Sequence, residues 1–123
     1  MWELTKSFGF EAAHTLSGTT FGPVAEEVHG HSYRAEVTIA GMPEPETGMI
    51  VDTGLLERQL AELRATLDHK FLNNINSLGK PTLENLARFI FDRVQGVGEV
   101  VRVTVRRDSC GEACSYFGPG NPN

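Results

Sequence analysis

Hydrophobic residues occupy every second position in two stretches near the start of the chain. In residues 3–13, Phe8, Phe10 and Ala12 fall on one face of an extended segment. In residues 32–40 the apolar positions are Tyr33, Ala35, Val37 and Ile39, and the polar positions between them are Arg34, Glu36 and Thr38. A period of two is typical of a strand with one buried face. Both stretches are therefore predicted to be β-strands.

Leucines then recur at helical spacing in the middle of the chain. Asp52, a residue type that caps helices, precedes a stripe that predicts an amphipathic helix over about residues 53–67. The stripe consists of Leu56, Leu60, Leu63 and Leu67. A second helix is predicted to begin at Thr82 and to end before Gly96 and Gly98. Its inner positions are Leu83, Leu86, Ile90 and Val94.

Two further strands complete the predicted fold. Valine alternates with polar residues at positions 101, 103 and 105, and a short strand is predicted at 115–117. The order ββααββ favours antiparallel pairing of consecutive strands, with both helices on one face. We therefore predict an α+β fold with a four-stranded antiparallel sheet, one domain over residues 1–118 and a frayed tail over 119–123. Open sheet edges favour pairing with other subunits.

Composition narrows the class of protein. A chain of 123 residues with 40% hydrophobic and 22% charged residues is expected to form one globular domain. A formal charge of −5 argues against a nucleic-acid partner. No apolar run is long enough to span a membrane, and the N-terminal residues lack a signal-peptide pattern, so we expect a cytoplasmic protein. Cys110 and Cys114 are expected to be reduced thiols there, and their spacing is only a weak metal signal.

The placement of the histidines carries the strongest chemical signal. His29 and His31 are two residues apart in an extended segment, so their side chains project to the same face. Two such imidazoles can bind one zinc ion at Zn–N distances of about 2.0–2.1 Å. His14 ends the first predicted strand, and antiparallel pairing would bring it near the other two. The alternative is a polar strand start without a metal, but the third histidine favours zinc.

Carboxylates stand beside the histidine motifs. Asp68 precedes His69 after the first predicted helix, where it can set the tautomer of the imidazole and raise its basicity. The alternative is a favourable cation at a helix C-terminus. Glu26 and Glu27 precede His29, and either can be a general base, a fourth zinc ligand, an acceptor for a ligating histidine or part of a solvated loop.

Asp108 ends the strand of alternating valines. A carboxylate at this position can accept two N–H bonds from an amidine-like ring edge. The sequence alone favours the plainer alternative, a surface charge paired with Arg106 or Arg107.

Several segments, taken in order, resemble the family of 6-pyruvoyl-tetrahydropterin synthase and bacterial 6-carboxy-tetrahydropterin synthase. They are FEAAH at 10–14, HGHSY at 29–33, GMIVD at 48–52, LDHKFLN at 67–73, PTLENLA at 81–87 and DSC at 108–110, with Tyr116 beyond. Each motif is modest alone. The ordered set is highly specific and spans nearly the whole chain.

The resemblance implies a fold, an assembly and a set of site residues. The fold is the T-fold, in which three subunits close their sheets into a barrel and two trimers stack into a homohexamer. Catalytic Zn²⁺ would be bound by His14, His29 and His31. Asp68 and His69 would form a proton relay, and some site residues would act across a subunit interface. The residues assigned to binding of a pterin substrate are Glu27, Thr82 and Asp108.

This sequence departs from the family pattern at two positions. Ala25 stands where the family has its catalytic cysteine, and Glu26 instead gives Glu-x-x-His-Gly-His. That motif resembles a subgroup in which glutamate replaces the cysteine and the pterin side chain is cleaved to leave a 6-hydroxymethyl group. Asp108 aligns with the glutamate that anchors the pterin, and aspartate is shorter by one methylene.

These departures favour zinc-dependent retro-aldol cleavage of the side chain of 7,8-dihydroneopterin or its triphosphate over 6-pyruvoyl formation, with Glu26 as catalytic base. Two alternatives remain within the family. One is 6-carboxy-tetrahydropterin synthase activity in the biosynthesis of deazapurines such as queuosine. The other is a pterin-binding homologue without catalytic activity.

A cupin, which is a metal-binding β-barrel, is the rival from outside the family. His29 and His31 followed by Glu36 imitate the cupin motif H-x-H-x4-E. Glu36 has the wrong strand parity for a shared metal, and two amphipathic helices interrupt the β pattern.

Overall fold

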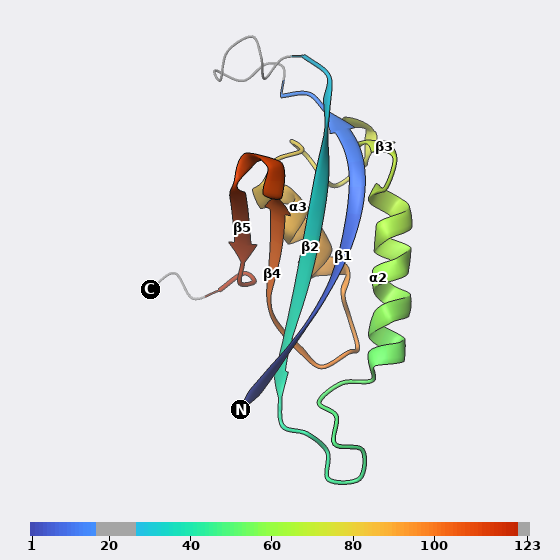
Figure 1. The fold of residues 1–123 in the computed structure, drawn as a ribbon, viewed down its shortest axis with the longest axis vertical. Coiled ribbons are helices and arrows are strands. Elements are labelled where there is room, and N and C mark those ends of the chain that lie inside the picture. The colour runs from blue at the N-terminus through green and yellow to red at the C-terminus, as the bar shows by residue number, and fades with distance from the viewer. Residues whose placement is uncertain (17–26, 121–123) are drawn as a thin grey trace.

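The computed structural model describes residues 1–16 and 27–120 and contains two α-helices against one sheet (Figure 1). The strands are β1 (Trp2–His14), β2 (His29–Gly41), β3 (Lys70–Phe71), β4 (Glu99–Arg107) and β5 (Glu112–Tyr116). The helices are α2 (Thr53–Leu67) and α3 (Leu83–Arg93), with short 3-10 turns η1 (Leu72–Asn74) and η2 (Asp108–Cys110). The predicted α+β class and both predicted helices are confirmed.

The sheet has five strands in the order β3-β1-β2-β4-β5, and the predicted count of four is wrong by one. The additional strand, β3, pairs parallel with β1 through Ala12 and Ala13, so the sheet is mixed rather than wholly antiparallel. A strand of two residues is too short to show an alternating pattern in the sequence. It nevertheless fixes the segment that follows α2 against the end of β1.

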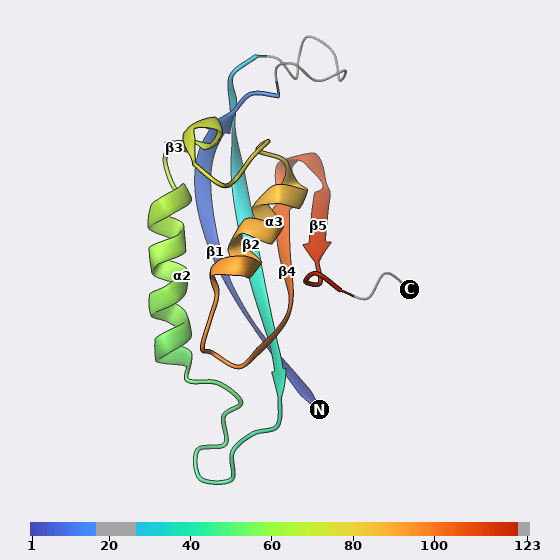
Figure 2. The ribbon, with the colours of Figure 1, turned by 180° about the vertical axis from the view of Figure 1, so that it is seen from behind.

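Both helices cover the same face of the sheet, as Figure 2 shows from behind. α2 packs along β1, and α3 packs across β4 and β5. The predicted inner face of β2 is confirmed, because Tyr33, Ala35, Val37 and Ile39 are at most 3% exposed. The predicted leucine stripe of α2 is buried as well. Within the described part of the chain, no helix is long and apolar enough to cross a membrane.

A register shift interrupts the valine alternation of β4. Thr38 pairs with Arg102, whereas Ile39 pairs with Val100, so Val101 is an extra residue in β4. Such a β-bulge bends the strand and changes which side chains face the core. Val103 and Val105 are buried as their parity predicts, but before the bulge it is Val100 that packs against the core.

The long β1–β2 hairpin extends beyond the rest of the sheet. β1 and β2 pair from Trp2–Gly41 to His14–His29, whereas the last β2–β4 pair is Arg34–Arg106. The end of the hairpin that carries His14 and His29 therefore projects past the paired part of β4. A strand end of this kind can present side chains to a ligand while the core holds the rest of the strand in register.

Candidate functional site

Three histidines converge at the projecting end of the hairpin. His14 and His29 lie directly opposite each other on β1 and β2, and His31 lies on the same face of β2. The ring centroids are 4.5 Å apart for His14–His29, 5.0 Å for His14–His31 and 4.8 Å for His29–His31. One nitrogen of each ring lies within 4.8 Å of the others. The prediction that His14, His29 and His31 lie close together is therefore confirmed.

Backbone carbonyls orient two of the three imidazoles. Nδ1 of His14 lies 2.9 Å from the carbonyl oxygen of Pro81, and Nδ1 of His29 lies 2.7 Å from that of Glu27. A carbonyl only accepts, so each Nδ1 carries a proton and each neutral ring has its lone pair on Nε2. The two Nε2 atoms are 2.9 Å apart. Facing lone pairs at that distance repel unless a cation lies between them, so the cluster fits a zinc ion.

The surroundings of His14 and His31 favour the neutral form of their imidazoles. Burial lowers the pKa of His14, although the bond to the Pro81 carbonyl opposes this shift. Burial, followed by the positive charge of Arg107, lowers the pKa of His31 to about 4. Both rings therefore hold free lone pairs at neutral pH, which ligation of a metal requires.

Asp68 and His69 lie between α2 and β3. The carboxylate of Asp68 accepts from the Glu11 amide at 2.9 Å and lies 3.1 Å from Arg64 and 3.6 Å from Nε2 of His69. The hydrogen bond from the Glu11 amide is the main cause that lowers the pKa of the Asp68 carboxyl. The positive charge of Arg64 lowers this pKa further. The amide of His69 in turn donates to the Glu11 carbonyl at 2.6 Å. An ionised carboxylate is thus fixed beside the imidazole.

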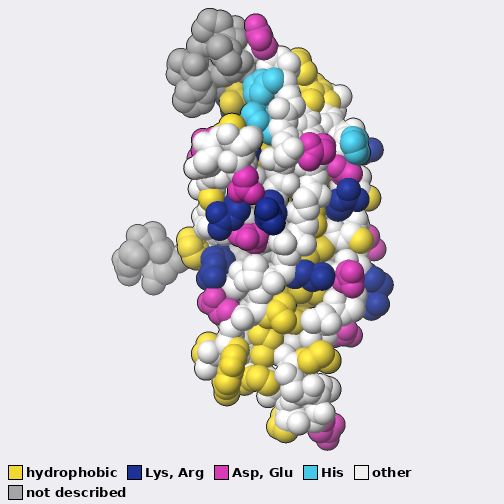
Figure 3. Space-filling view, viewed as in Figure 1, with side chains coloured by type: hydrophobic (Ala, Val, Ile, Leu, Met, Phe, Trp, Pro, Cys, Tyr) yellow, Lys and Arg dark blue, Asp and Glu magenta, His cyan; other side chains and the backbone are white. Residues whose placement is uncertain are grey.

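The sheet separates His69 from the histidine cluster within one chain. The cluster shares its face with the buried residues of β1 and β2, whereas Glu11 and Ser32 point to the opposite face. His69 lines a cavity of about 490 Å³ together with Glu11, Ser32 and one member of the cluster, His31. Figure 3 shows histidine side chains at two separate places on the face that it displays. The sequence did not predict this separation.

Asp108 is a surface carboxylate in η2. Its side chain is 62% exposed and lies 3.2 Å from Arg34. The prediction of a surface ion pair for Asp108 is confirmed, but the predicted partners are wrong. Arg106 pairs with Glu36, and Arg107 pairs with Glu112. Asp108 lines a cavity of about 410 Å³ with Arg34.

Thr82 and Glu27 have structural contacts besides the roles implied by the resemblance. The Thr82 hydroxyl caps α3 by accepting from the Asn85 amide at 3.2 Å. The carbonyl oxygen of Glu27 accepts a hydrogen bond from Nδ1 of His29, and Glu27 itself is exposed. Ala25 and Glu26 lie outside the described residues.

Replacing Thr82 with alanine should destabilise the protein by about 1 kcal/mol, because the helix loses its N-cap. Thr82→Ser keeps an oxygen at the same position and should lose less than half of that. Urea unfolding of both variants measures the difference. Equal stability of Thr82→Ala and the wild type would show that the cap does not contribute.

Comparison with known proteins places the chain in a family. A family profile described as 6-pyruvoyl tetrahydropterin synthase matches residues 3–119. The chain belongs to the 6-pyruvoyl tetrahydropterin synthase family. It is 36% identical over 126 residues to 6-carboxy-5,6,7,8-tetrahydropterin synthase of Synechocystis, covering 97% of this chain and 95% of that protein. It is also 34% identical over 86 residues to dihydroneopterin monophosphate aldolase of Pyrococcus furiosus, covering 70% and 68% of the two chains.

The fold of the family is present as well. The structure of 6-pyruvoyl tetrahydropterin synthase from Caenorhabditis elegans matches with a TM-score of 0.80 at 22% identity, covering 95% of each chain. This confirms the T-fold expected for a member of the 6-pyruvoyl tetrahydropterin synthase family. The cupin interpretation is wrong, since Glu36 pairs with Arg106 at 2.9 Å and two helices cover the sheet.

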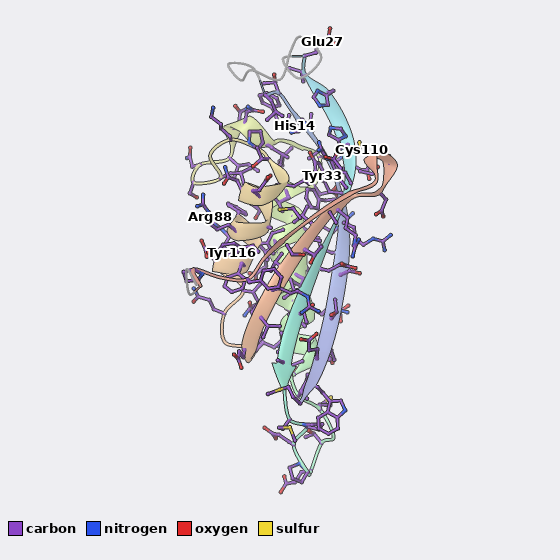
Figure 4. All side chains as sticks on the ribbon, turned by 90° about the vertical axis from the view of Figure 1, so that its left-hand side faces the viewer. His14, Glu27, Tyr33, Arg88, Cys110 and Tyr116 are labelled. Carbon is purple, nitrogen blue, oxygen red and sulfur yellow. The ribbon has the colours of Figure 1, made fainter. Side chains whose placement is uncertain are left out.

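The structure of this family member adds residues that the sequence analysis did not select. Arg107, at the end of β4, has NH1 3.4 Å from Nε2 of His31 and NH2 2.7 Å from the carboxylate of Glu112. Tyr33 is buried two positions beyond His31 on the same face, and burial raises its pKa to about 12. In Figure 4, His14 and Tyr33 lie below Glu27, near the end of the hairpin. Strand parity could have found both, because Arg107 and Tyr33 share the inward parity of the buried valines and His31.

Proposed function

We propose that this protein cleaves the side chain of a 7,8-dihydroneopterin-type substrate by a zinc-dependent retro-aldol reaction. The observation that carries the proposal is the cluster of three histidines, two of which direct lone pairs at each other across 2.9 Å. The replacement of the family cysteine by Ala25, with Glu26 next to it, selects cleavage over the other reactions. The named aldolase among the relatives supports the same choice.

The proposed zinc ligands are His14, His29 and His31. Zinc bound there would act as a Lewis acid and lower the pKa of side-chain hydroxyl groups of the substrate. Lowering a hydroxyl pKa suits a base weaker than a thiolate. A carboxylate is such a base, so the proposal assigns Glu26 to remove the proton of the 2′-hydroxyl.

The electron balance of the step follows from this assignment. As the 2′-oxygen loses its proton, a carbonyl forms at C2′ and the bond between C1′ and C2′ breaks. The electron pair of that bond passes to C1′ and the adjoining ring, and a proton must then reach C1′ to leave a hydroxymethyl group. We assign His69 to this proton transfer, with Asp68 as the carboxylate that orients it.

The position of His69 supports an oligomeric site. In one chain His69 shares a cavity with Glu11 and Ser32, whose strand parity is opposite to that of the three proposed zinc ligands, and it makes no described contact with the imidazole rings of those ligands. A substrate that reaches both sets therefore requires His69 from a neighbouring subunit. The homohexamer expected from the family resemblance would supply such a neighbour, because the sheet has open edges at β5 and along the part of β1 that the short β3 leaves unpaired.

A second candidate function is 6-carboxy-tetrahydropterin synthesis. It is favoured by the relative that covers nearly the whole of this chain at 36% identity. The same histidines would serve that reaction, but it would start from proton abstraction at carbon. Ala25 removes the thiolate that the family uses opposite the histidine.

Product analysis by mass spectrometry tests the proposal. Zinc-loaded protein incubated with dihydroneopterin, and separately with its phosphate esters, should yield a 6-hydroxymethyl pterin. Glu26→Gln should lower the rate by about a hundredfold to ten-thousandfold, the range of a lost general base. Glu27→Gln should affect KM, as expected for the substrate-binding role implied by the resemblance, and should keep most of kcat. A 6-pyruvoyl or 6-carboxy product, or a fully active Glu26→Gln variant, would contradict the assignment.

A further inference from the structure

Arg64 lies in the last turn of α2, where its side chain reaches the edge of β1. Its Nε donates to the carbonyl oxygen of Gly9 at 3.0 Å, and its NH2 lies 3.1 Å from Oδ2 of Asp68. One guanidinium therefore contacts both the first strand and the carboxylate that stands beside His69. The family resemblance gave no role to Arg64.

The Asp68 carboxylate has a partner at each of its two oxygens. Oδ1 accepts a hydrogen bond from the Glu11 amide at 2.9 Å. Oδ2 lies 3.1 Å from NH2 of Arg64 and 3.6 Å from Nε2 of His69. A carboxylate with a single partner can rotate about that contact, whereas partners at both oxygens fix its plane. The side chain of Asp68 is only 12% exposed, so water has little access to take the place of either partner.

The imidazole of His69 depends on the position of this carboxylate. The His69 amide donates to the Glu11 carbonyl at 2.6 Å, which holds the backbone, but its side chain is 80% exposed. The distance of 3.6 Å between Nε2 and Oδ2 is too long for a hydrogen bond. The ring must therefore move toward Oδ2 when it takes up a proton, and the plane of the Asp68 carboxylate sets the direction of that movement.

The bond to Gly9 distinguishes Arg64 from an ordinary surface ion pair. Exposed pairs four residues apart on a helix contribute little, because both side chains stay mobile. Here Nε is bonded to a main-chain carbonyl of β1, and Gly9 is itself held in the β1–β2 ladder opposite Arg34. The planar fork of arginine can keep this bond and still direct NH2 at Asp68.

We propose that Arg64 is a positioning residue for proton transfer by His69. It fixes the plane of the Asp68 carboxylate so that Oδ2 stays directed at Nε2 of His69, and it touches no substrate itself. The inference rests on the proposed function for the reaction that His69 serves. The arrangement of Arg64, Asp68 and His69 is the same whichever pterin product is formed.

Steady-state kinetics of an Arg64 series test the inference. Arg64→Gln should lower kcat by about tenfold to a hundredfold, the cost of a misplaced catalytic group, and leave KM within about twofold. Arg64→Lys keeps the charge near Asp68 without the fork, so it should lose only about threefold to tenfold. Arg58→Gln is the matched control: Arg58 is an exposed arginine six residues earlier on the same helix, and kcat should stay within about twofold of the wild-type value.

A double-mutant cycle with Asp68→Asn shows whether Arg64 acts through Asp68. The asparagine keeps an oxygen for the Glu11 amide and removes the charge that Arg64 faces. Adding Arg64→Gln to Asp68→Asn should therefore cost no more than about twofold further in kcat. Losses that multiply, or a wild-type kcat in Arg64→Gln, would overturn the inference. If Arg64→Gln fails to fold by circular dichroism, the cycle is run with Arg64→Lys, and a wild-type kcat in that variant would overturn the inference instead.

A titration of the Asp68 carboxyl by NMR separates this inference from the proposed function, because it needs no substrate. The Glu11 amide, followed by the positive charge of Arg64, holds the pKa of Asp68 below its usual value. Arg64→Gln should raise that pKa, and Arg58→Gln should leave it unchanged. An unchanged pKa in Arg64→Gln would overturn the inference. A raised pKa in a protein that converts no pterin would overturn the proposed function and support the placement of Asp68 by Arg64.

Discussion

Replacing His31 with glutamine is expected to remove zinc from the protein and to lower kcat/KM by about a thousandfold or more, since a Lewis acid supplies several kcal/mol of transition-state stabilisation. His31 is the best of the three ligands to replace. His14 is 1% exposed and bonded to the Pro81 carbonyl, so its loss would also damage the core. His31 is only partly buried, so its replacement should leave the fold intact.

His69→Gln is the matched control for His31→Gln. Both variants replace a histidine of the proposed site, but His69 lies across the sheet from the cluster. His69→Gln should therefore keep one zinc per chain while losing activity. Zinc content by mass spectrometry of the metal and kcat/KM should be measured on both. If His31→Gln retained full zinc, the three-histidine site would be wrong.

His69→Gly should lower activity while leaving stability unchanged or raising it by about 0.5–1 kcal/mol. His69 has a φ of 58°, the left-handed region that glycine adopts without steric cost. Its side chain is 80% exposed and its only described side-chain contact is to Asp68, so stability alone does not explain a histidine here. The proposed role in proton transfer would explain it, and the loss of that role should slow turnover about a hundredfold to ten-thousandfold.

Ser77→Gly separates the backbone effect from the chemistry. Ser77 is the other described non-glycine residue with positive φ, at 67°, and it lies outside the proposed site. Its replacement also removes the hydroxyl that accepts from Arg93 at 2.9 Å, so the gain in stability should be smaller than for His69→Gly, and turnover should stay at the wild-type value. Urea unfolding and steady-state kinetics on both variants give the comparison. A His69→Gly variant with wild-type turnover would remove His69 from the proposed mechanism.

Strand parity predicted the larger part of the fold and of the histidine cluster. The alternation in β1 and β2 placed the core face correctly, and the same parity put His29 and His31 on that face. The end of β1 brought His14 opposite His29, as antiparallel pairing requires. These features depend on a periodic pattern over many residues, which a sequence displays directly.

The features that the sequence did not predict depend on short segments and on contacts between distant ones. β3 is only two residues long, and the bulge at Val101 shifts the register by a single residue. The separation of His69 from the cluster follows from how β3 joins β1. The bond between Arg107 and Glu112 depends on the conformation of the turn between β4 and β5, which the DSC motif at 108–110 locates but does not describe.

The two carbonyls that hold His14 and His29 have a consequence for how the site tolerates mutation. Their acceptors belong to the main chain at Pro81 and Glu27, not to side chains. No exchange of side chain at either position deletes the acceptor atom itself. The orientation of these imidazoles instead depends on the backbone conformation of two loops. Changes in loop length should therefore reorient the imidazoles more than most point substitutions do.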